Sequence, residues 1–269
     1  GIGKDEPIDS VLNVISNLKE VAGYCFENFA PDGPQKRMFF TNENAKKIDS
    51  IRDSLDYWQV QGHINEFEFD YLLASLINAA DHVANMSGTY GAFLKIWRSV
   101  ALKPLELKKL EIIDNGRENF VYQRDAVKLL PSLSGHVLYL DPPYNSRQYA
   151  SNFHMLETLA VWDKQILRGV AGLRDYEDQK SDFSSKRLAE TALAKLIENA
   201  NFDFIALSYS NEGIIPQNRL QELLSSRGKL MSFQTPYKRF RTERTHENRK
   251  YKTDDDLVTE HLWVVATSN

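Results

Sequence analysis

Apolar residues in the first hundred positions recur at spacings of three and four, the period of one face of an α-helix. The recurring positions form three stripes: Val11, Leu12, Ile15 and Leu18; Ile48, Ile51, Leu55 and Trp58; and Leu72, Leu73, Leu76, Ile77, Ala80 and Val83. Such stripes are typical of helices that pack on a shared core. The pattern therefore predicts a helical domain over residues 1–110.

From about residue 111 the pattern changes to short apolar runs that alternate with helical segments. The runs are residues 120–122, 137–140, 202–208, 230–233 and 261–266, and the predicted helices lie around residues 126–130, 188–197 and 220–224. Alternation of strands and helices predicts an α/β fold with a doubly wound sheet. We expect one domain over residues 111–269, with its last two strands paired antiparallel as a hairpin.

Composition narrows the class of protein. Among the 269 residues, 42% are hydrophobic and 26% are charged, which is ordinary for a globular protein. No stretch approaches the roughly 18 consecutive apolar residues of a membrane span. The single cysteine, Cys25, excludes an internal disulfide framework and any multi-cysteine metal site, and the six histidines show no metal-ligand spacing. We expect a cytoplasmic protein without a metal or a membrane.

Charge is distributed unevenly along the chain. The formal net charge of −4 argues against a protein that coats nucleic acid indiscriminately. Between residues 237 and 252, however, seven basic and two acidic residues give a local net charge of +5. Such a segment either follows a phosphate backbone or is a solvated surface loop, and charge alone leaves both readings open.

The most informative motif is Asp141, Pro142, Pro143 and Tyr144, directly after the apolar run 137–140. Proline restricts the residue before it and cannot donate to a strand ladder, so the motif marks the end of a buried strand. In open parallel sheets, ligands bind at the carboxyl ends of the strands. A carboxylate and a proline carbonyl held side by side suit an exocyclic NH2 group, which has two hydrogens to donate.

The same residues define a chemistry for that amine. The ring of Tyr144 can stack on the flat heterocycle that carries the amine. Hydrogen bonds from both amine protons to Asp141 and the Pro142 carbonyl favour a pyramidal nitrogen whose lone pair can attack. Asp141 can then accept the proton, directly or through water, once transfer makes the amine cationic.

These residues resemble the adenine-specific DNA N6-methyltransferases, in particular the group related to Dam methylase. Residues 141–144 match that family's catalytic motif, so the resemblance implies catalytic roles for Asp141, Pro142 and Tyr144. Three further stretches are similar: residues 119–130 with Asp125 at the centre, residues 204–211, and the basic segment before Glu260 and the last apolar strand. In the family the acidic residue at Asp125 approaches S-adenosylmethionine, which implies that Asp125, Ala126 and Asp141 contact this cofactor.

The resemblance also implies a Rossmann-like methyltransferase sheet with a helical target-recognition region, acting on a flipped adenine in double-stranded DNA. Residues 145–154, which include Tyr149 and His154, look like the loop that closes over the active site. A cognate restriction endonuclease acting on the same DNA site is an expected partner. The glycine-containing segment 84–91, with Tyr90, is either a DNA-reading loop or a plain connector. The expected DNA contacts are Tyr149, Lys238, Arg239, Arg241 and Arg244.

One departure from the family is serious: no Phe-x-Gly-x-Gly motif precedes or follows residues 141–144. We therefore expect that the chain starts after the first strands of the methyltransferase sheet, and that a longer gene or another polypeptide supplies the glycine motif. Two rival functions remain. One is an RNA aminomethyltransferase, since guanine-N2 enzymes also use an Asp-Pro-Pro-aromatic motif. The other is a DNA-binding portion that is inactive without a missing cofactor-binding half.

Overall fold

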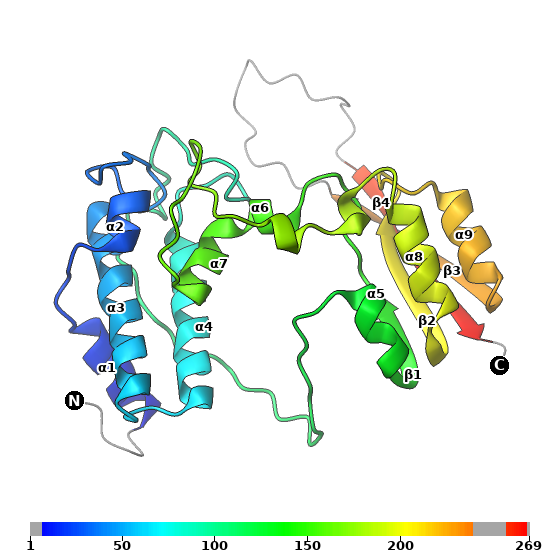
Figure 1. Cartoon of the computed structure of the whole chain (residues 1–269), viewed down its shortest axis with the longest axis horizontal. Coiled ribbons are helices and arrows are strands. Elements are labelled where there is room, and N and C mark those ends of the chain that lie inside the picture. Colours follow the sequence, from blue (N-terminus) through cyan, green and yellow to red (C-terminus); the bar gives the residue numbers. More distant parts are fainter. Residues whose placement is uncertain (1–6, 239–256, 268–269) are drawn as a thin grey trace. The chain divides into compact units, whose positions relative to one another are not determined.

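A computed structural model describes residues 7–238 and 257–267 and divides the chain into two compact units. The helical unit comprises residues 1–117 and 150–177, and the sheet unit comprises residues 118–149 and 178–269. The chain thus leaves the helical unit once, returns to it and leaves it again, as the colours along the chain show (Figure 1). No helix of the described residues is long and apolar enough to cross a membrane.

The helical unit is built on two long antiparallel helices, α3 and α4. Thr41 begins α3 by accepting a hydrogen bond from the backbone N–H of Asn44, and Asn65 and Glu68 form a capping box at the start of α4. The second and third apolar stripes lie in these helices, as predicted. The helices of this region are α1 (Ile8–Ser16), α2 (Tyr24–Phe29), α3 (Asn42–Val60), α4 (Glu66–Val83), α6 (Tyr149–Asn152) and α7 (His154–Val161).

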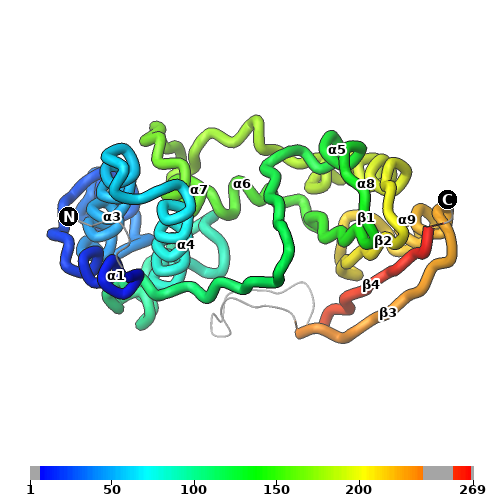
Figure 2. Tube along the Cα trace, turned by 90° about the horizontal axis from the view of Figure 1, so that it is seen from below, coloured from blue at the N-terminus to red at the C-terminus, as the bar shows by residue number. Residues whose placement is uncertain are grey.

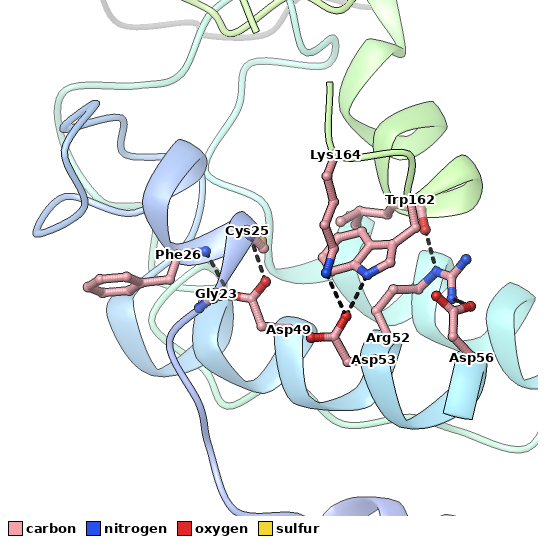
Figure 3. A network of polar contacts seen from close by, with 10 residues as sticks. Gly23, Cys25, Phe26, Asp49, Arg52, Asp53, Asp56, Trp162 and Lys164 are labelled. Carbon is pink, nitrogen blue, oxygen red and sulfur yellow. Dashed lines mark hydrogen bonds and ion pairs between the residues drawn. The ribbon is translucent and has the colours of Figure 1, made fainter. Parts of the chain in front are cut away.

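Buried polar side chains of α3 fix the elements around it (Figure 3). The Asp49 carboxylate accepts hydrogen bonds from the backbone N–H groups of Gly23, Cys25 and Phe26, at 2.7–3.0 Å. These are the first N–H groups of α2, which have no partner within that helix. Burial nevertheless raises the pKa of Asp49 to about 6, although the three N–H groups oppose the shift. Asp49 therefore acts as the N-terminal cap of α2.

A second residue of α3, Arg52, holds the end of α7. Its guanidinium is buried and donates to the carbonyls of Leu159 and Ala160, at 2.9 and 3.2 Å, and also pairs with Asp56. The carbonyls of a last helical turn have no partner within the helix, so Arg52 satisfies them. The next residue of α3, Asp53, accepts a hydrogen bond from the Trp162 indole at 2.8 Å (Figure 3). These contacts attach the returning segment 150–177 to the first part of the chain.

The segment 84–91 belongs to the same core. Tyr90 is fully buried, and its hydroxyl donates to Asp81 at 2.6 Å. The backbone of Tyr90 also bonds to Asn152 and to the His154 ring, at 2.8 and 2.9 Å. Of the two readings of this segment, a DNA-reading loop or a plain connector, the packed and paired side chain of Tyr90 favours the connector.

Four described strands form the sheet of the sheet unit, in the order β1-β2-β4-β3. β1 is parallel to β2, whereas β4 is antiparallel to both β2 and β3. The α/β class and the terminal antiparallel pair are thus confirmed, and β4 inserts between β2 and β3. The elements are α5 (Ala126–Leu129), η1 (Leu130–Ser132), β1 (Ser134–Leu140), η2 (Glu177–Gln179), η3 (Asp182–Ser184), α8 (Ala189–Glu198), β2 (Asn201–Ser210), α9 (Gln217–Ser225), β3 (Gly228–Lys238) and β4 (Leu257–Thr267).

The predicted strand at residues 120–122 does not form. Phe120 and Val121 are 66% and 96% exposed and lie in an irregular segment. β1 is an edge strand of the described sheet, and β2 is the only strand beside it there. An extended apolar run forms a strand only where another strand offers hydrogen bonds, and residues 120–122 have no such neighbour among the described residues.

The two faces of the sheet differ in what covers them. On the covered face, side chains of α5, α8 and α9 pack with strand residues that include Leu140, Ile205, Leu207, Trp263 and Val265. Figures 1 and 2 both show α8 and α9 on the same side of the strands. The opposite side, here called the open face, carries partly exposed apolar residues from all four strands: Val137, Tyr139, Phe204, Met231, Phe233 and Leu262.

Candidate active site

The carboxyl ends of β1 and β2 and the first residues of β4 meet at one edge of the sheet. Leu140 pairs with Leu207, so β2 continues three residues further, to Ser210. Ser210 in turn pairs with Glu260 of β4. Asp141, which directly follows β1, therefore lies beside the last residues of β2 and near the start of β4. We call Asp141, Pro142, Tyr144, Ser210, Asn211 and Glu260 the strand-end site.

Tyr144 is fixed from two sides and still presents its ring. Its carbonyl accepts a hydrogen bond from the backbone N–H of Ile214 at 2.9 Å. Its ring meets the buried ring of Tyr209 edge to face, with centroids 6.1 Å apart. Tyr144 keeps 36% of its surface exposed, which leaves aromatic surface for a stacking partner. Burial, followed by the charge of Glu260, raises the pKa of its hydroxyl, so Tyr144 remains neutral.

Tyr209 also supports the loop after β2. Its hydroxyl accepts a hydrogen bond from the backbone N–H of Ile215 at 3.2 Å. Gly213 passes so close to this ring that an added Cβ would lie 2.0 Å from Cε1 of Tyr209. A residue without a side chain is therefore required there for the loop to fold over Tyr209. The result is a fixed path for the backbone that holds Tyr144.

Polar residues at the end of β2 position the start of β4. The backbone N–H of Asn211 donates to the Thr259 carbonyl at 3.0 Å, and the Asn211 side chain accepts from the Thr259 N–H at 3.1 Å. Next along both strands, the buried Ser210 lies opposite Glu260 in the strand register. Residues 208–211, the end of the stretch that resembles the family, thus lie at the strand-end site, although Tyr209 itself is buried in the core.

Glu260 was missed by the sequence reasoning as a site residue. It is partly buried, and its neighbours are Ser210 on β2 and Thr235 on β3. Burial and the nearby Asp141 carboxylate raise the pKa of Glu260, and the Ser210 hydroxyl opposes that shift. The signal was weak in the sequence, because a single Glu at the start of an apolar strand has many structural explanations.

The residues after the motif are held by a neighbouring segment of the same unit. Gln148 makes two hydrogen bonds to the backbone of Ser181, at 2.8 and 3.1 Å, and the Ser184 hydroxyl donates to the Arg147 carbonyl at 3.2 Å. Tyr149 begins α6 and lies close enough to Tyr144 to raise the pKa of its hydroxyl. Tyr149 is thus near the motif, as the resemblance implies, and its predicted DNA contact stays a prediction.

His154 belongs to the helical unit and is fully buried there. Its Nε2 lies 2.9 Å from the carbonyl of Tyr90, and burial lowers the pKa of the ring. His154 is therefore packed and hydrogen-bonded in the core of the helical unit, which favours a structural role over one as a general base.

Asp125 forms the N-terminal cap of α5, and Ala126 is the first residue of that helix. One carboxylate oxygen of Asp125 accepts from the backbone N–H of Val127 at 2.9 Å. Asp125 and Ala126 are both exposed, so the second oxygen of Asp125 can accept a hydrogen bond from a ligand. These residues fit one part of an S-adenosylmethionine site, and their contact with the cofactor stays a prediction.

The predicted DNA-binding cations are mostly outside the described residues. Lys238 is exposed at the end of β3, opposite Leu257 of β4. Arg239, Arg241 and Arg244 lie outside the described residues, so their predicted contacts remain untested. Within residues 7–238 and 257–267, no group of three or more His, Cys, Asp or Glu side chains is arranged to hold a metal ion.

Two findings define the class of protein to which this chain belongs. The first is the Asp-Pro-Pro-Tyr motif at a strand end of an α/β sheet, and the second is a family model that matches most of the chain. The family model "D12 class N6 adenine-specific DNA methyltransferase" matches residues 8–223, and the chain belongs to this family. Among curated relatives, the type II methyltransferase M.FokI of Planomicrobium okeanokoites is 43% identical over 249 residues. The type II methyltransferase M.NlaIII of Neisseria lactamica is 38% identical over 254 residues.

A third relative, the modification methylase StsI of Streptococcus sanguinis, is 37% identical over 249 residues. These matches cover 91%, 94% and 90% of this chain for M.FokI, M.NlaIII and StsI. The chain spans 38% of the length of M.FokI and of StsI, and 75% of the length of M.NlaIII. No solved structure is significantly similar to it.

Proposed function

We propose that the protein is a site-specific DNA adenine N6-methyltransferase, the modification enzyme of a restriction-modification system. The observation that carries this proposal is the placement of Asp141, Pro142 and Tyr144 at the carboxyl end of β1, beside the end of β2. The names of the relatives, which are type II methyltransferases and a modification methylase, support the same activity. A cognate endonuclease that cuts the same DNA site and a cytoplasmic location complete the proposal.

In this proposal the target adenine leaves the duplex and stacks on the exposed part of the Tyr144 ring. Asp141 and the Pro142 carbonyl accept the two hydrogens of N6, which aligns the nitrogen lone pair. S-adenosylmethionine, when bound, supplies an electrophilic methyl group. N6 would gain the methyl group and one positive charge while the bond from that methyl group to the sulfonium sulfur breaks, which leaves the donor as a neutral thioether. Asp141 would then take a proton from N6 to leave the neutral methylated base.

We propose that Asp125 and Ala126, at the start of α5, contribute to the cofactor surface together with Asp141. The exposed second oxygen of Asp125 supports this assignment. Lys238, Arg239, Arg241, Arg244 and Tyr149 would contact DNA. The predicted helical domain, residues 1–110, would read the target sequence, and the hydrophobic core that it shares with residues 150–177 supports a separate role for this unit.

A methylation assay with the full-length protein and Asp141→Ala tests this function. We expect the wild type to label duplex DNA from S-adenosylmethionine, and Asp141→Ala to lose about 10³-fold in rate while it still binds DNA. Asp203→Ala is the matched control, because Asp203 is an exposed aspartate near the start of β2. Wild-type methylation by Asp141→Ala contradicts the mechanism, and labelling of structured RNA in place of duplex DNA favours the rival RNA aminomethyltransferase.

A further inference from the structure

The two ends of the antiparallel pair α3 and α4 are joined to segments of opposite charge. Where α3 leads into α4, residues 53–70 hold five acidic residues and no lysine or arginine. At the other end, after α4, residues 82–105 hold three cations and no acidic residue: Lys95, Arg98 and Lys103. Figure 1 shows the turn between the two helices at one end and the chain after α4 at the other. A phosphate backbone is repelled by the first segment and attracted by the second.

One buried side chain fixes the stretch that carries Lys95 and Arg98. The Asn85 amide is fully buried and donates to the carbonyls of Met38 and Leu94, at 3.1 and 2.9 Å. Its side-chain oxygen accepts from the backbone N–H of Arg98 at 3.0 Å. The backbone carbonyl of Asn85 also accepts from the N–H of Leu94 at 3.0 Å. Leu94 and Arg98 are therefore both held, on either side of the three residues between them.

A second buried amide fixes the far end of the same stretch. Asn44, in the first turn of α3, donates to the Lys103 carbonyl and accepts from the Leu105 N–H, both at 2.9 Å. Between the two amides, Ala101 is fully buried. We call residues 94–103 the fixed loop. Because its backbone is held at several points, its exposed side chains lose little further freedom when they bind a partner.

The fixed loop presents cationic and apolar side chains to solvent. Lys95, Arg98 and Lys103 are exposed, and Ile96 keeps 79% of its surface exposed. One guanidinium nitrogen of Arg98 donates to the Met86 carbonyl at 3.1 Å, which orients the group and leaves other N–H donors for a ligand. Cations that flank an apolar side chain suit a nucleic-acid groove, because the cations can reach phosphates while the apolar group meets base edges.

Acidic groups at the adjoining helix ends leave these cations available. Asp81, near the end of α4, accepts the Tyr90 hydroxyl at 2.6 Å. Glu43 lies in the first turn of α3, where the helix N-terminus favours its negative charge. In the part of the chain that the structure describes, none of the three cations of the fixed loop forms an ion pair.

We infer that the fixed loop is the part of the helical unit that contacts duplex DNA. This inference rests on the proposed function, and it names the residues with which the helical region would read its target. Lys95 and Arg98 contact phosphates, and Ile96, which lies between them in the sequence, contacts base edges in the groove. The acidic segment 53–70, at the opposite end of α3 and α4, faces away from the DNA.

Binding of the full-length protein to two duplexes tests the phosphate contact. One duplex is a sequence that the wild type methylates, and the other is a scrambled duplex of the same length. We expect Lys95→Ala to bind both about 5- to 10-fold more weakly at about 0.1 M salt, and to reduce the salt dependence, the slope of log K against log salt, by about 1. Lys19→Ala is the matched control at an exposed lysine before α2, and it should bind like the wild type.

Ile96→Ala tests the base contact separately. Loss of an apolar contact to base edges should lower the ratio of cognate to scrambled affinity about 5- to 10-fold, while binding to the scrambled duplex stays unchanged. Val60→Ala is its control, because Val60 is 80% exposed at the end of α3 and belongs to the acidic segment. Thermal unfolding of all four variants should match that of the wild type, since each substituted side chain is exposed.

Wild-type affinity and salt dependence in Lys95→Ala, or an equal loss in Lys19→Ala, overturn the phosphate contact, and an unchanged affinity ratio in Ile96→Ala overturns the base contact. Both outcomes are read while the wild type still methylates duplex DNA. A wild-type protein that transfers no methyl group to DNA, or that transfers it to structured RNA in place of DNA, overturns the proposed function instead.

Discussion

The two units of the chain bury their apolar and polar groups in different ways. In the helical unit, the buried charged side chains of Asp49 and Arg52 cap the ends of neighbouring helices. In the sheet unit, helices pack on one face of the described sheet, and the open face keeps Val137, Tyr139 and Phe233 more than half exposed. The comparison teaches that buried charge serves folding in the first unit, whereas in the second unit Asp141 and Glu260 place two carboxylates at the strand-end site.

Arg52→Ala should have the largest effect on stability. The substitution leaves the carbonyls of Leu159 and Ala160 without their donor, so we expect a loss of about 3 kcal/mol in the helical unit. Lys164→Ala is the control, because its ion pair with Asp53 is half exposed and should contribute under about 1 kcal/mol. Chemical denaturation measures both losses, and equal values for the two variants would show that Arg52 does not fasten α7.

Val265→Ala and Val137→Ala compare the two faces of the sheet with the same chemical change. Val265 is fully buried under the helices, so its truncation should cost about 2.5 kcal/mol in free energy of unfolding. Val137 is 59% exposed on the open face, and the same truncation should cost about 0.5 kcal/mol. A comparable loss for both variants in the full-length protein would mean that the open face is covered there.

The last prediction concerns how the stability of the helical unit depends on pH. The folded-state pKa of Asp49, about 6, lies above the value near 3.9 expected for an unfolded chain, so the folded state binds more protons between these values. Stability of this unit should therefore rise as pH falls, by about 1.4 kcal/mol from pH 7.5 to 5. Amide hydrogen exchange over α2 and α3 measures it. Persistence of the same dependence in Asp49→Asn would exclude Asp49 as its source.

The pattern of apolar residues predicted much of this fold, because the period of a single helix or strand is visible in residues that are neighbours in the sequence. The stripe from Leu72 to Val83 and the apolar run before Asp141 each define one element by its own period. The strand predicted at residues 120–122 failed because strand formation depends on a neighbour, which pattern does not report. The same limit explains Tyr90, whose glycine-containing surroundings suggested an exposed loop although its ring fills the helical core.

At the site, sequence identified the residues with distinctive chemistry and missed those defined by pairing. Asp141, Pro142 and Tyr144 are recognisable because two prolines after an aspartate are rare at a strand end. Glu260 became visible only through the register that places it opposite Ser210, 50 positions earlier in the chain. Residues from separate strands are brought together by the fold, and no local spacing in the sequence signals that.

The most direct test of the central claim is the identity of the methylated atom. Duplex DNA treated with the full-length protein and S-adenosylmethionine can be digested to nucleosides and analysed by mass spectrometry against synthetic standards. The account predicts N6-methyladenine as the product with the wild type and with Asp203→Ala, and its formation about 10³-fold more slowly with Asp141→Ala. Methylated cytosine or guanine in place of N6-methyladenine, or N6-methyladenine formed by Asp141→Ala at the wild-type rate, would contradict it.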